Sequence, residues 1–363
     1  MNDNNAHLSS MLRTYKIKVL NMELRDFIQQ LKHQMTSPAI VMADAQGLRL
    51  GGLDIKFGIV GGVKFRHLVS NMQGLRVHVK EDMNKFQLEP ELSKHFACVA
   101  RRLRKSALRH GRKLNNGKLV RLMKFTLTKR HTLKLRVQRT DYFTFMATNL
   151  NLKEAIWPVG TDHENVSLAK HYGDALFNLN KPYMANALNV IAMLVTADGF
   201  TFLPRRSSAV YERPNTLQAS VGGSVCYKKD GPEPPLEALK REILEEWGIE
   251  VADSECRFLA LGINRHTGEP DLIAIVKTGK MLVDVIGSYV RLDDTFEFAN
   301  YRTIPLSIDR IDDLVLPLVS EMWSQPSDQA AYLMMLFAQF PNGSGRIESS
   351  IKKLISSSPS QRC

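Results

Sequence analysis

The chain of 363 residues has a formal net charge of +12 at pH 7, with 44% hydrophobic and 24% charged residues. That length allows two domains, and the composition is that of a globular protein. The N-terminal sequence lacks the layout of a secretory signal, and no apolar run approaches the ~20 residues of a membrane-spanning helix. We therefore expect a soluble cytoplasmic protein without a membrane partner.

The cysteine pattern argues against two further classes. The four cysteines form no CxxC pair and stand near no histidine cluster; they are Cys98, Cys226, Cys256 and Cys363. This spacing indicates neither a zinc site nor a disulfide framework, and it is typical of a reducing compartment.

The positive charge is concentrated in one segment. Residues 101–140 contain fifteen Lys or Arg and no Asp or Glu, so the rest of the chain carries +12 − 15 = −3. A segment this basic is a candidate surface for nucleic acid, although Phe125 is its one aromatic residue, which does not favour stacking on single-stranded bases. The alternative is an accessory domain that docks on the acidic remainder or on another subunit. Both interpretations stay open, as does a homo-oligomer.

The first part of the chain predicts an α+β unit. A helix is expected at 22–35, a glycine-rich strand-like stretch at 39–67 and an amphipathic helix at 88–110. LVRLMKFTLT and LKLRVQR then alternate apolar with basic or polar residues around KRHT, which predicts a hairpin with one basic face. We assign residues 1–140 to a basic accessory domain.

The second part predicts strands before and after one central helix. Two apolar runs meet at Asp198-Gly199, a strong hairpin signal, and 258–279 supplies another strand pair around a polar turn. Closing helical segments are expected at 314–323 and 328–340. This order predicts an α/β layer fold for residues 141–345, followed by a flexible tail at 346–363.

The central helix, expected at 235–248, carries a candidate metal site. Glu242, Glu245 and Glu246 lie within about a 100° arc of this helix, beside its apolar stripe. Like charges at i, i+4 destabilise a helix by roughly 0.2–0.5 kcal/mol, whereas Mg²⁺ is bound by a few carboxylates with water and phosphate oxygens. A charged trio alone is typical of a solvated face.

Three further residues favour the metal site over that solvated face. Glu233, seven residues, and then Arg241-Glu242-Ile243-x-Glu245-Glu246-x-Gly248-Ile249 resembles the Nudix box, the signature of the Nudix hydrolase superfamily. The resemblance covers roughly 141–345, strongly in 222–249 and only in layout elsewhere, while residues 1–140 match no family that we can name. It implies a Nudix-like mixed sheet sandwiched by helices.

The resemblance also implies a reaction and roles. Nudix enzymes use Mg²⁺ or Mn²⁺ to hydrolyse the pyrophosphate bond of a nucleoside diphosphate linked to another group. Glu242, Glu245 and Glu246 would bind the metal ion, and Glu233 would contact it through water or hold Arg241, which positions the glutamates. Metal neutralises the phosphate charge and activates the attacking water.

One position departs from the box. The glycine that normally stands six residues before Glu233 is Tyr227 here. The nearest candidates are Gly222 and Gly223, and Gly223 stands ten residues before Glu233, which indicates an insertion of about 10 − 6 = 4 residues. We keep the backbone of Gly223 as a candidate metal contact.

The remaining candidates are less tightly defined. Glu245 is the first choice for the general base that takes the proton of the attacking water, with Glu269 and Glu297 as alternatives from later loops. Arg205 and Arg206 end the second strand before the box, where they either reach phosphates or form a polar strand end. His266 is an ordinary loop residue.

Three functions follow from these residues. The first is a metal-dependent hydrolase of a nucleotide sugar, ADP-ribose or a dinucleotide. The second is a hydrolase of RNA 5′ ends that holds the chain with its basic domain. The third is a Nudix-like nucleotide sensor whose basic part binds nucleic acid. The complete set of box acids favours an enzyme over a sensor.

Overall fold

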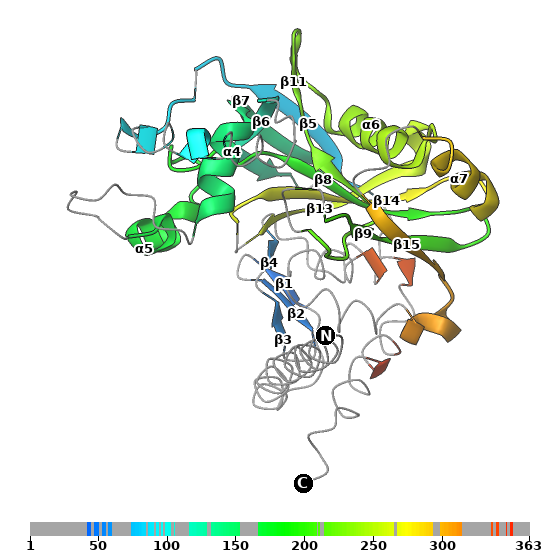
Figure 1. Cartoon of the computed structure of the whole chain (residues 1–363). Helices are drawn as coiled ribbons and strands as arrows, with labels where there is room; N and C mark the ends of the chain where they lie inside the picture. The colour runs from blue at the N-terminus through cyan, green and yellow to red at the C-terminus, as the bar shows by residue number, and fades with distance from the viewer. Residues whose placement is uncertain are drawn as a thin grey trace, which may run out of the picture.

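The structure is a computed structural model of the whole chain (Figure 1). It describes residues 42–44, 47–50, 53–55, 57–59, 74–84, 86–90, 92–93, 96, 99–102, 105, 116–128, 132–152, 166–208, 210, 214–264, 267–292, 298–313, 335–336, 339–340, 346 and 349–350.

A seven-stranded mixed sheet forms the centre of the molecule. Its strand order is β15-β9-β8-β14-β13-β4, and β10 pairs with β8 beside this path. Neighbouring strands are antiparallel except β14 and β8, which are parallel, so the predicted α/β fold with a mixed sheet is confirmed. The strands are β4 (Phe57–Ile59), β8 (Asn189–Val195), β9 (Phe200–Arg206), β10 (Val221–Ser224), β13 (Cys256–Asn264), β14 (Pro270–Lys277) and β15 (Phe298–Pro305).

Both hairpins predicted in the second part of the chain are confirmed. β8 and β9 are antiparallel and meet at the Asp198-Gly199 turn, where Gly199 has φ of 79°. This φ lies in the left-handed region that glycine adopts without a steric penalty. β13 and β14 form the second antiparallel pair.

Helix α6 (Pro235–Trp247) packs over β8 and β10 and beside α7 (Leu282–Tyr289) (Figure 1). Pro235 occupies its first turn, where a missing N–H costs nothing, and Gly248 ends it with φ of 67°. Its apolar stripe is buried, and Trp247 donates its indole N–H to the Ser220 carbonyl at 2.7 Å. The predicted helix is therefore confirmed to within one residue.

A second sheet comes from the first part of the chain. It has the order β5-β7-β6 and consists of β5 (Arg76–Glu81), β6 (Lys118–Leu127) and β7 (Thr132–Asp141). β6 and β7 are the antiparallel hairpin expected around KRHT. Along β7, Leu133, Leu135 and Val137 are buried while Lys134 and Arg136 are exposed, which confirms the basic face of the hairpin.

The two sheets share one hydrophobic core. Leu122 and Leu135 belong to the same buried cluster as Val190, Leu194 and Trp247. Backbone hydrogen bonds continue across the junction: Val120 N–H donates to the Val225 carbonyl at 2.9 Å, and Leu188 N–H donates to the Val120 carbonyl at 2.8 Å. The division proposed at residue 140 stays a prediction, and it runs through this core.

The other described elements are short. A three-stranded sheet consists of β1 (Met42–Asp44), β2 (Gly47–Leu50) and β3 (Leu53–Ile55). The short helices are α4 (Tyr142–Thr148) and α5 (Leu168–Tyr172), with 3₁₀ turns at Asn149–Asn151, Gly173–Phe177, Asp253–Glu255 and Ile308–Arg310. A small hairpin joins β11 (Tyr227–Lys228) and β12 (Gly231–Pro232).

Several predictions fall wholly or mostly outside the described residues. These are the helix at 22–35, the segments at 314–323 and 328–340, and most of the tail at 346–363. Within 88–110, the described residues from 90 to 105 have helical geometry. In the part of the chain that the structure describes, every helix is too short or too polar to cross a membrane.

Candidate active site

The three glutamates of α6 that belong to the predicted metal site lie in two different environments. Glu242 and Glu246 are buried, with exposed fractions of 9% and 7%, whereas the Glu245 side chain is 57% exposed. Both buried carboxylates lie where α6 packs on β10. The helix therefore presents two enclosed anions and one that reaches solvent.

Arg241 connects all the acidic residues of the box except Glu246. Its guanidinium donates from Nε and Nη2 to the two carboxylate oxygens of Glu233, at 3.2 and 3.1 Å. Nη1 donates to Glu242 at 2.8 Å and to Glu245 at 3.0 Å. The planar fork of an arginine suits this two-oxygen contact with a carboxylate. Arg241 thus fixes the position of Glu242 relative to Glu233, as the predicted Arg–Glu pair requires.

Glu233 is a buried anion that is held by donors from Arg241, Lys228 and Cys226. The Cys226 N–H donates to it at 3.1 Å, and the Lys228 ammonium lies 2.6 Å from its other oxygen. Burial alone would raise the pKa of Glu233, but the hydrogen bonds from Arg241, Lys228 and Cys226 outweigh it and lower the pKa. In return, the same carboxylates raise the pKa of Arg241 against the opposing effect of burial. The pair is therefore charged on both sides.

Two glycines of β10 receive the buried carboxylates. The Gly222 N–H donates to Glu246 at 3.3 Å. A Cβ at Gly223 would lie 2.0 Å from the Glu242 carboxyl carbon, so any larger residue there would displace this carboxylate from its observed position. The glycine pair is thus a cradle for the acidic side chains of α6.

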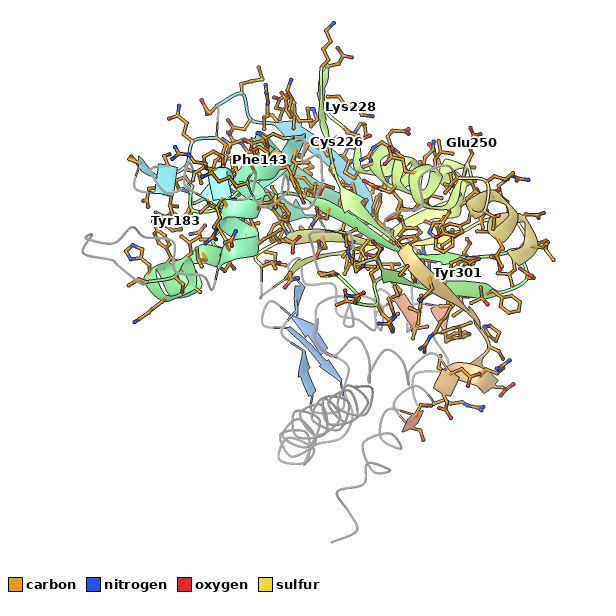
Figure 2. All side chains as sticks on the ribbon, in the orientation of Figure 1. Phe143, Tyr183, Cys226, Lys228, Glu250 and Tyr301 are labelled. Atoms are coloured by element: carbon orange, nitrogen blue, oxygen red, sulfur yellow. The ribbon has the colours of Figure 1, made fainter. Side chains whose placement is uncertain are left out.

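The stretch in which we predicted an insertion folds as the β11–β12 hairpin. Figure 2 labels Cys226 just before this hairpin and Lys228 within it, and the hairpin projects away from the sheet. The Tyr227 hydroxyl donates to Glu81 of β5, which raises the pKa of Tyr227, and the Arg139 guanidinium lies 5.7 Å from the centre of the Tyr227 ring. The residue that replaces the usual box glycine therefore anchors the hairpin to the second sheet.

A cleft opens on the sheet face opposite to α6. Strand register pairs Ser224 of β10 with Asn189 of β8, and Asn189 with Asp271 of β14, so the three side chains form a row. The Ser224 hydroxyl donates to Asn189 at 2.8 Å, and the Asn189 amide donates to Asp271 and Glu269, each at 3.2 Å. The cleft has a volume of about 100 Å³ and opens to solvent. A Cβ at Gly222 would meet only open space, because Gly222 has no neighbours on the cleft side. The backbone of β10 therefore forms most of the barrier between the cleft and the carboxylates of Glu242 and Glu246.

The two predicted arginines diverge. Arg206 lines the cleft and donates to Gln218 at 2.7 Å, whereas Arg205 donates to the Asn215 carbonyl at 2.8 Å and does not line the cleft. Neighbouring residues of a strand point to opposite faces, which explains the separation. Arg206 thus remains a candidate substrate contact, and Arg205 is better described as a polar strand end.

The candidates for the general base are also separated. Glu269 is 3% exposed and lines the cleft, where Asn189 and the Thr267 hydroxyl donate to it. Glu297 and His266 lie outside the described residues. Sequence reasoning missed Asn189, Asp271 and Gln218, because single polar residues in or beside apolar strands form no motif and only the strand register brings them together.

The carboxylates of Glu242, Glu245 and Glu246 are the type of ligand that a divalent metal ion prefers, but they are not arranged around a common metal position. Among the described residues, no group of three or more His, Cys, Asp and Glu is arranged to hold a metal ion. The glycine cradle nevertheless collects the carboxylate oxygens of Glu242 and Glu246 at one strand, and Glu245 is one turn away. Oxygen ligands of this kind are those that Mg²⁺ and Mn²⁺ prefer.

Comparisons with known proteins give weak structural likenesses. No family model matches the chain, and no curated protein matches it. Protein DR0079 from Deinococcus radiodurans is 21% identical over 41% of this chain and 80% of its own, with a TM-score of 0.29. A MutT protein from Methanosarcina mazei Go1 is 19% identical over 43% of this chain and 93% of its own, with a TM-score of 0.27.

A third solved structure is a bifunctional NMN adenylyltransferase/ADP ribose pyrophosphatase from Francisella tularensis, complexed with AMP and a Mn ion. It is 13% identical over 44% of both chains, with a TM-score of 0.28. Likenesses of this size carry no conclusion about activity.

Proposed function

We propose that this protein hydrolyses the pyrophosphate bond of a nucleoside diphosphate linked to another group, with a divalent metal ion. One observation carries the proposal: Arg241 joins Glu233 to Glu242, and Glu242 and Glu246 sit against a glycine pair that has room for their carboxylates. A solvated helix face has no need of such a cradle. The substrate types that we favour are a nucleotide sugar, ADP-ribose or a dinucleotide.

The residues divide the work. Mg²⁺ or Mn²⁺ held by Glu242, Glu245 and Glu246 would neutralise the diphosphate and lower the pKa of the attacking water. Arg241 fixes the Glu242 carboxylate through a 2.8 Å contact and is itself fixed by Glu233. Glu245 reaches solvent and is our choice as the base that takes the proton of the attacking water.

The test is a screen of nucleoside diphosphate derivatives with Mg²⁺ or Mn²⁺, reading mononucleotide release. Glu246→Gln keeps the shape and the acceptor for Gly222 N–H but removes the charge. Removing a residue that only hydrogen-bonds to a metal ligand typically lowers activity about 10- to 100-fold. We expect Glu246→Gln, which alters a proposed ligand itself, to lower turnover by about tenfold or more. Glu237→Gln on the first turn of α6 is the matched control, because its side chain is 51% exposed and outside the cluster. Equal turnover of wild type and Glu246→Gln contradicts the metal site.

A second candidate function is supported by the basic face. Lys134 and Arg136 are exposed on β7, and Lys124 of β6 pairs directly with Arg136, so this face can contact phosphates of RNA, although Arg136 also forms an ion pair with Asp82. We propose that nucleic acid binding accompanies hydrolysis if the substrate is an RNA 5′ end. Binding of a short RNA should then weaken steeply between 50 and 200 mM salt, by about 10-fold or more for a few phosphate contacts. Absence of RNA binding at low salt favours the small-nucleotide substrate.

A further inference from the structure

The buried carboxylate of Glu233 is surrounded by four donors. Its Oε1 accepts from Arg241 Nε at 3.2 Å and lies 2.6 Å from the Lys228 ammonium. Its Oε2 accepts from Arg241 Nη2 and from the Cys226 N–H, each at 3.1 Å. A carboxylate has about four acceptor positions, so all of them are used. The Lys228 contact is the shortest of the four.

Two of these donors come from the stretch that departs from the box. Lys228 lies in β11 of the projecting hairpin, and Cys226 immediately precedes that strand. The Glu233 N–H donates back to the Cys226 carbonyl at 3.0 Å and closes the base of the hairpin. The box residues include Glu233 and Arg241 but no lysine between them and the glycine pair. Lys228 is therefore an addition made by the hairpin of this chain.

The hairpin that carries Lys228 is held by all three strands of the second sheet. The Tyr227 hydroxyl donates to Glu81 of β5, and the Arg139 guanidinium of β7 lies 5.7 Å from the centre of the Tyr227 ring. Leu119 of β6 forms an antiparallel bridge with the residue just before the hairpin. An ion pair between two mobile surface side chains contributes little, because both must be ordered. Here the carboxylate is buried and the backbone that carries the lysine is anchored.

Arg241 passes the position of Glu233 on to the acids of the proposed metal site. The guanidinium that holds Glu233 through Nε and Nη2 also donates from Nη1 to Glu242 at 2.8 Å and to Glu245 at 3.0 Å. Without the lysine, Oε1 keeps only the 3.2 Å contact, which is the longest of the four. The carboxylate can then turn toward its remaining donors. Because the guanidinium is a rigid plane, a turn of Glu233 also moves the donor of Glu242.

We infer that Lys228 is a positioning residue of the hydrolysis, which acts through Glu233 and Arg241 on the acids proposed to bind the metal ion. In this role Lys228 touches neither the substrate nor the metal ion. The inference rests on the proposed function, which supplies the reaction and the metal ion.

The experiment compares matched changes on the hairpin. Lys228→Met removes the ammonium at similar length, and Lys228→Arg keeps a cation. Lys229→Met is the control, because this neighbour on the same hairpin is also an exposed lysine. Lys228→Met is also made in a Glu233→Gln background. For every protein that circular dichroism shows to be folded at the assay temperature, kcat and KM are measured for the best substrate of the screen, and the Kd for Mn²⁺ is measured by calorimetry without substrate.

Lys228→Met should lower kcat and weaken Mn²⁺ binding by about 5- to 10-fold, since it acts two contacts beyond Arg241's bond to a metal ligand, where losses are about 10- to 100-fold. KM should change by less than about twofold, because Lys228 does not bind the substrate. Lys228→Arg should lie closer to wild type than to Lys228→Met, and Lys229→Met should equal wild type. In the Glu233→Gln background, Lys228→Met should change kcat and Mn²⁺ binding by less than about twofold, because no carboxylate is left for it to hold.

Three results overturn the inference. If Lys228→Met behaves as Lys229→Met, the contact is a surface ion pair without effect on the site. An equal loss in both backgrounds shows that Lys228 acts independently of Glu233, for example through the folding of the hairpin. A raised KM with unchanged kcat shows that Lys228 binds the substrate instead.

Failure of the proposed function gives a different result. Wild type would then release no mononucleotide, and calorimetry would decide about Lys228. Weaker Mn²⁺ binding in Lys228→Met, with no further loss in the Glu233→Gln background, supports the positioning role at a metal site that serves another reaction. A wild-type protein that binds no Mn²⁺ overturns the inference.

Discussion

Gly223→Ala tests the glycine cradle at the smallest scale, because it adds one methyl group. The new Cβ would lie 2.0 Å from the Glu242 carboxyl carbon and 2.1 and 2.4 Å from its two oxygens. Ordinary contact begins near 3.4 Å, so the carboxylate must move by at least 3.4 − 2.0 = 1.4 Å. Such a shift removes the 2.8 Å contact with Arg241. A displacement of about 1 Å at a reacting centre can cost about 10²-fold in rate, and we expect kcat to fall by that factor.

The assay is steady-state hydrolysis of the best substrate from the screen over a Mg²⁺ titration, with Mn²⁺ binding measured in parallel by calorimetry. Gly223→Ala should raise the metal concentration for half-maximal rate as well as lower kcat. Gly287→Ala in α7 is the control, because its Cβ meets open space, and this variant should behave as wild type. Wild-type kcat and metal midpoint in Gly223→Ala would refute the cradle.

Two further predictions concern stability. Glu233→Gln should destabilise the protein by about 3 kcal/mol at pH 7, because it leaves Arg241 and Lys228 beside a neutral amide. Because folding lowers the pKa of Glu233, the wild-type protein has this extra stability above the unfolded pKa of about 4.5 and loses it as pH falls through the folded pKa. The free energies of urea unfolding of the two proteins should therefore converge in acid. A difference in unfolding free energy that stays constant with pH contradicts the ion-pair assignment. Arg121→Met should lower the free energy of unfolding by about 2–4 kcal/mol, because it leaves the Leu179, Lys181 and Met184 carbonyls without their donor. Lys134→Met, at an exposed position, should change the free energy of unfolding by less than about 0.5 kcal/mol. Equal effects of the two variants in thermal unfolding contradict a structural role for Arg121.

Local pattern predicted those elements whose residues fix them locally. The box helix follows from the apolar stripe and from Gly248, which ends α6 in the left-handed conformation. The β8–β9 hairpin follows from Asp198-Gly199, and the β6–β7 hairpin from alternation along both strands. In each case the signal spans fewer than about thirty residues, and the partner groups are close in sequence.

The features that sequence did not predict depend on distant partners. Arg121 was counted among the basic residues, yet it is 1% exposed, and burial lowers its pKa to about 10. It donates to three backbone carbonyls between residues 179 and 184, about sixty residues away. The cleft is likewise assembled by register between β8, β10 and β14, and no local period marks Asn189 or Asp271 as neighbours.

The core shared by the two sheets has a consequence for protein engineering. Thr140 is 5% exposed and pairs with Leu119 at the end of β7, so the chain passes residue 140 inside a strand rather than through a surface linker. Insertions, cleavage sites and circular permutation succeed at exposed loop tips, where the backbone makes few hydrogen bonds. We therefore expect the Lys229–Asp230 turn of the projecting hairpin, with its exposed side chains, to accept added residues far better than position 140. A tag or fluorescent domain belongs at that turn only if the Tyr227 anchor and the Lys228 contact are kept intact.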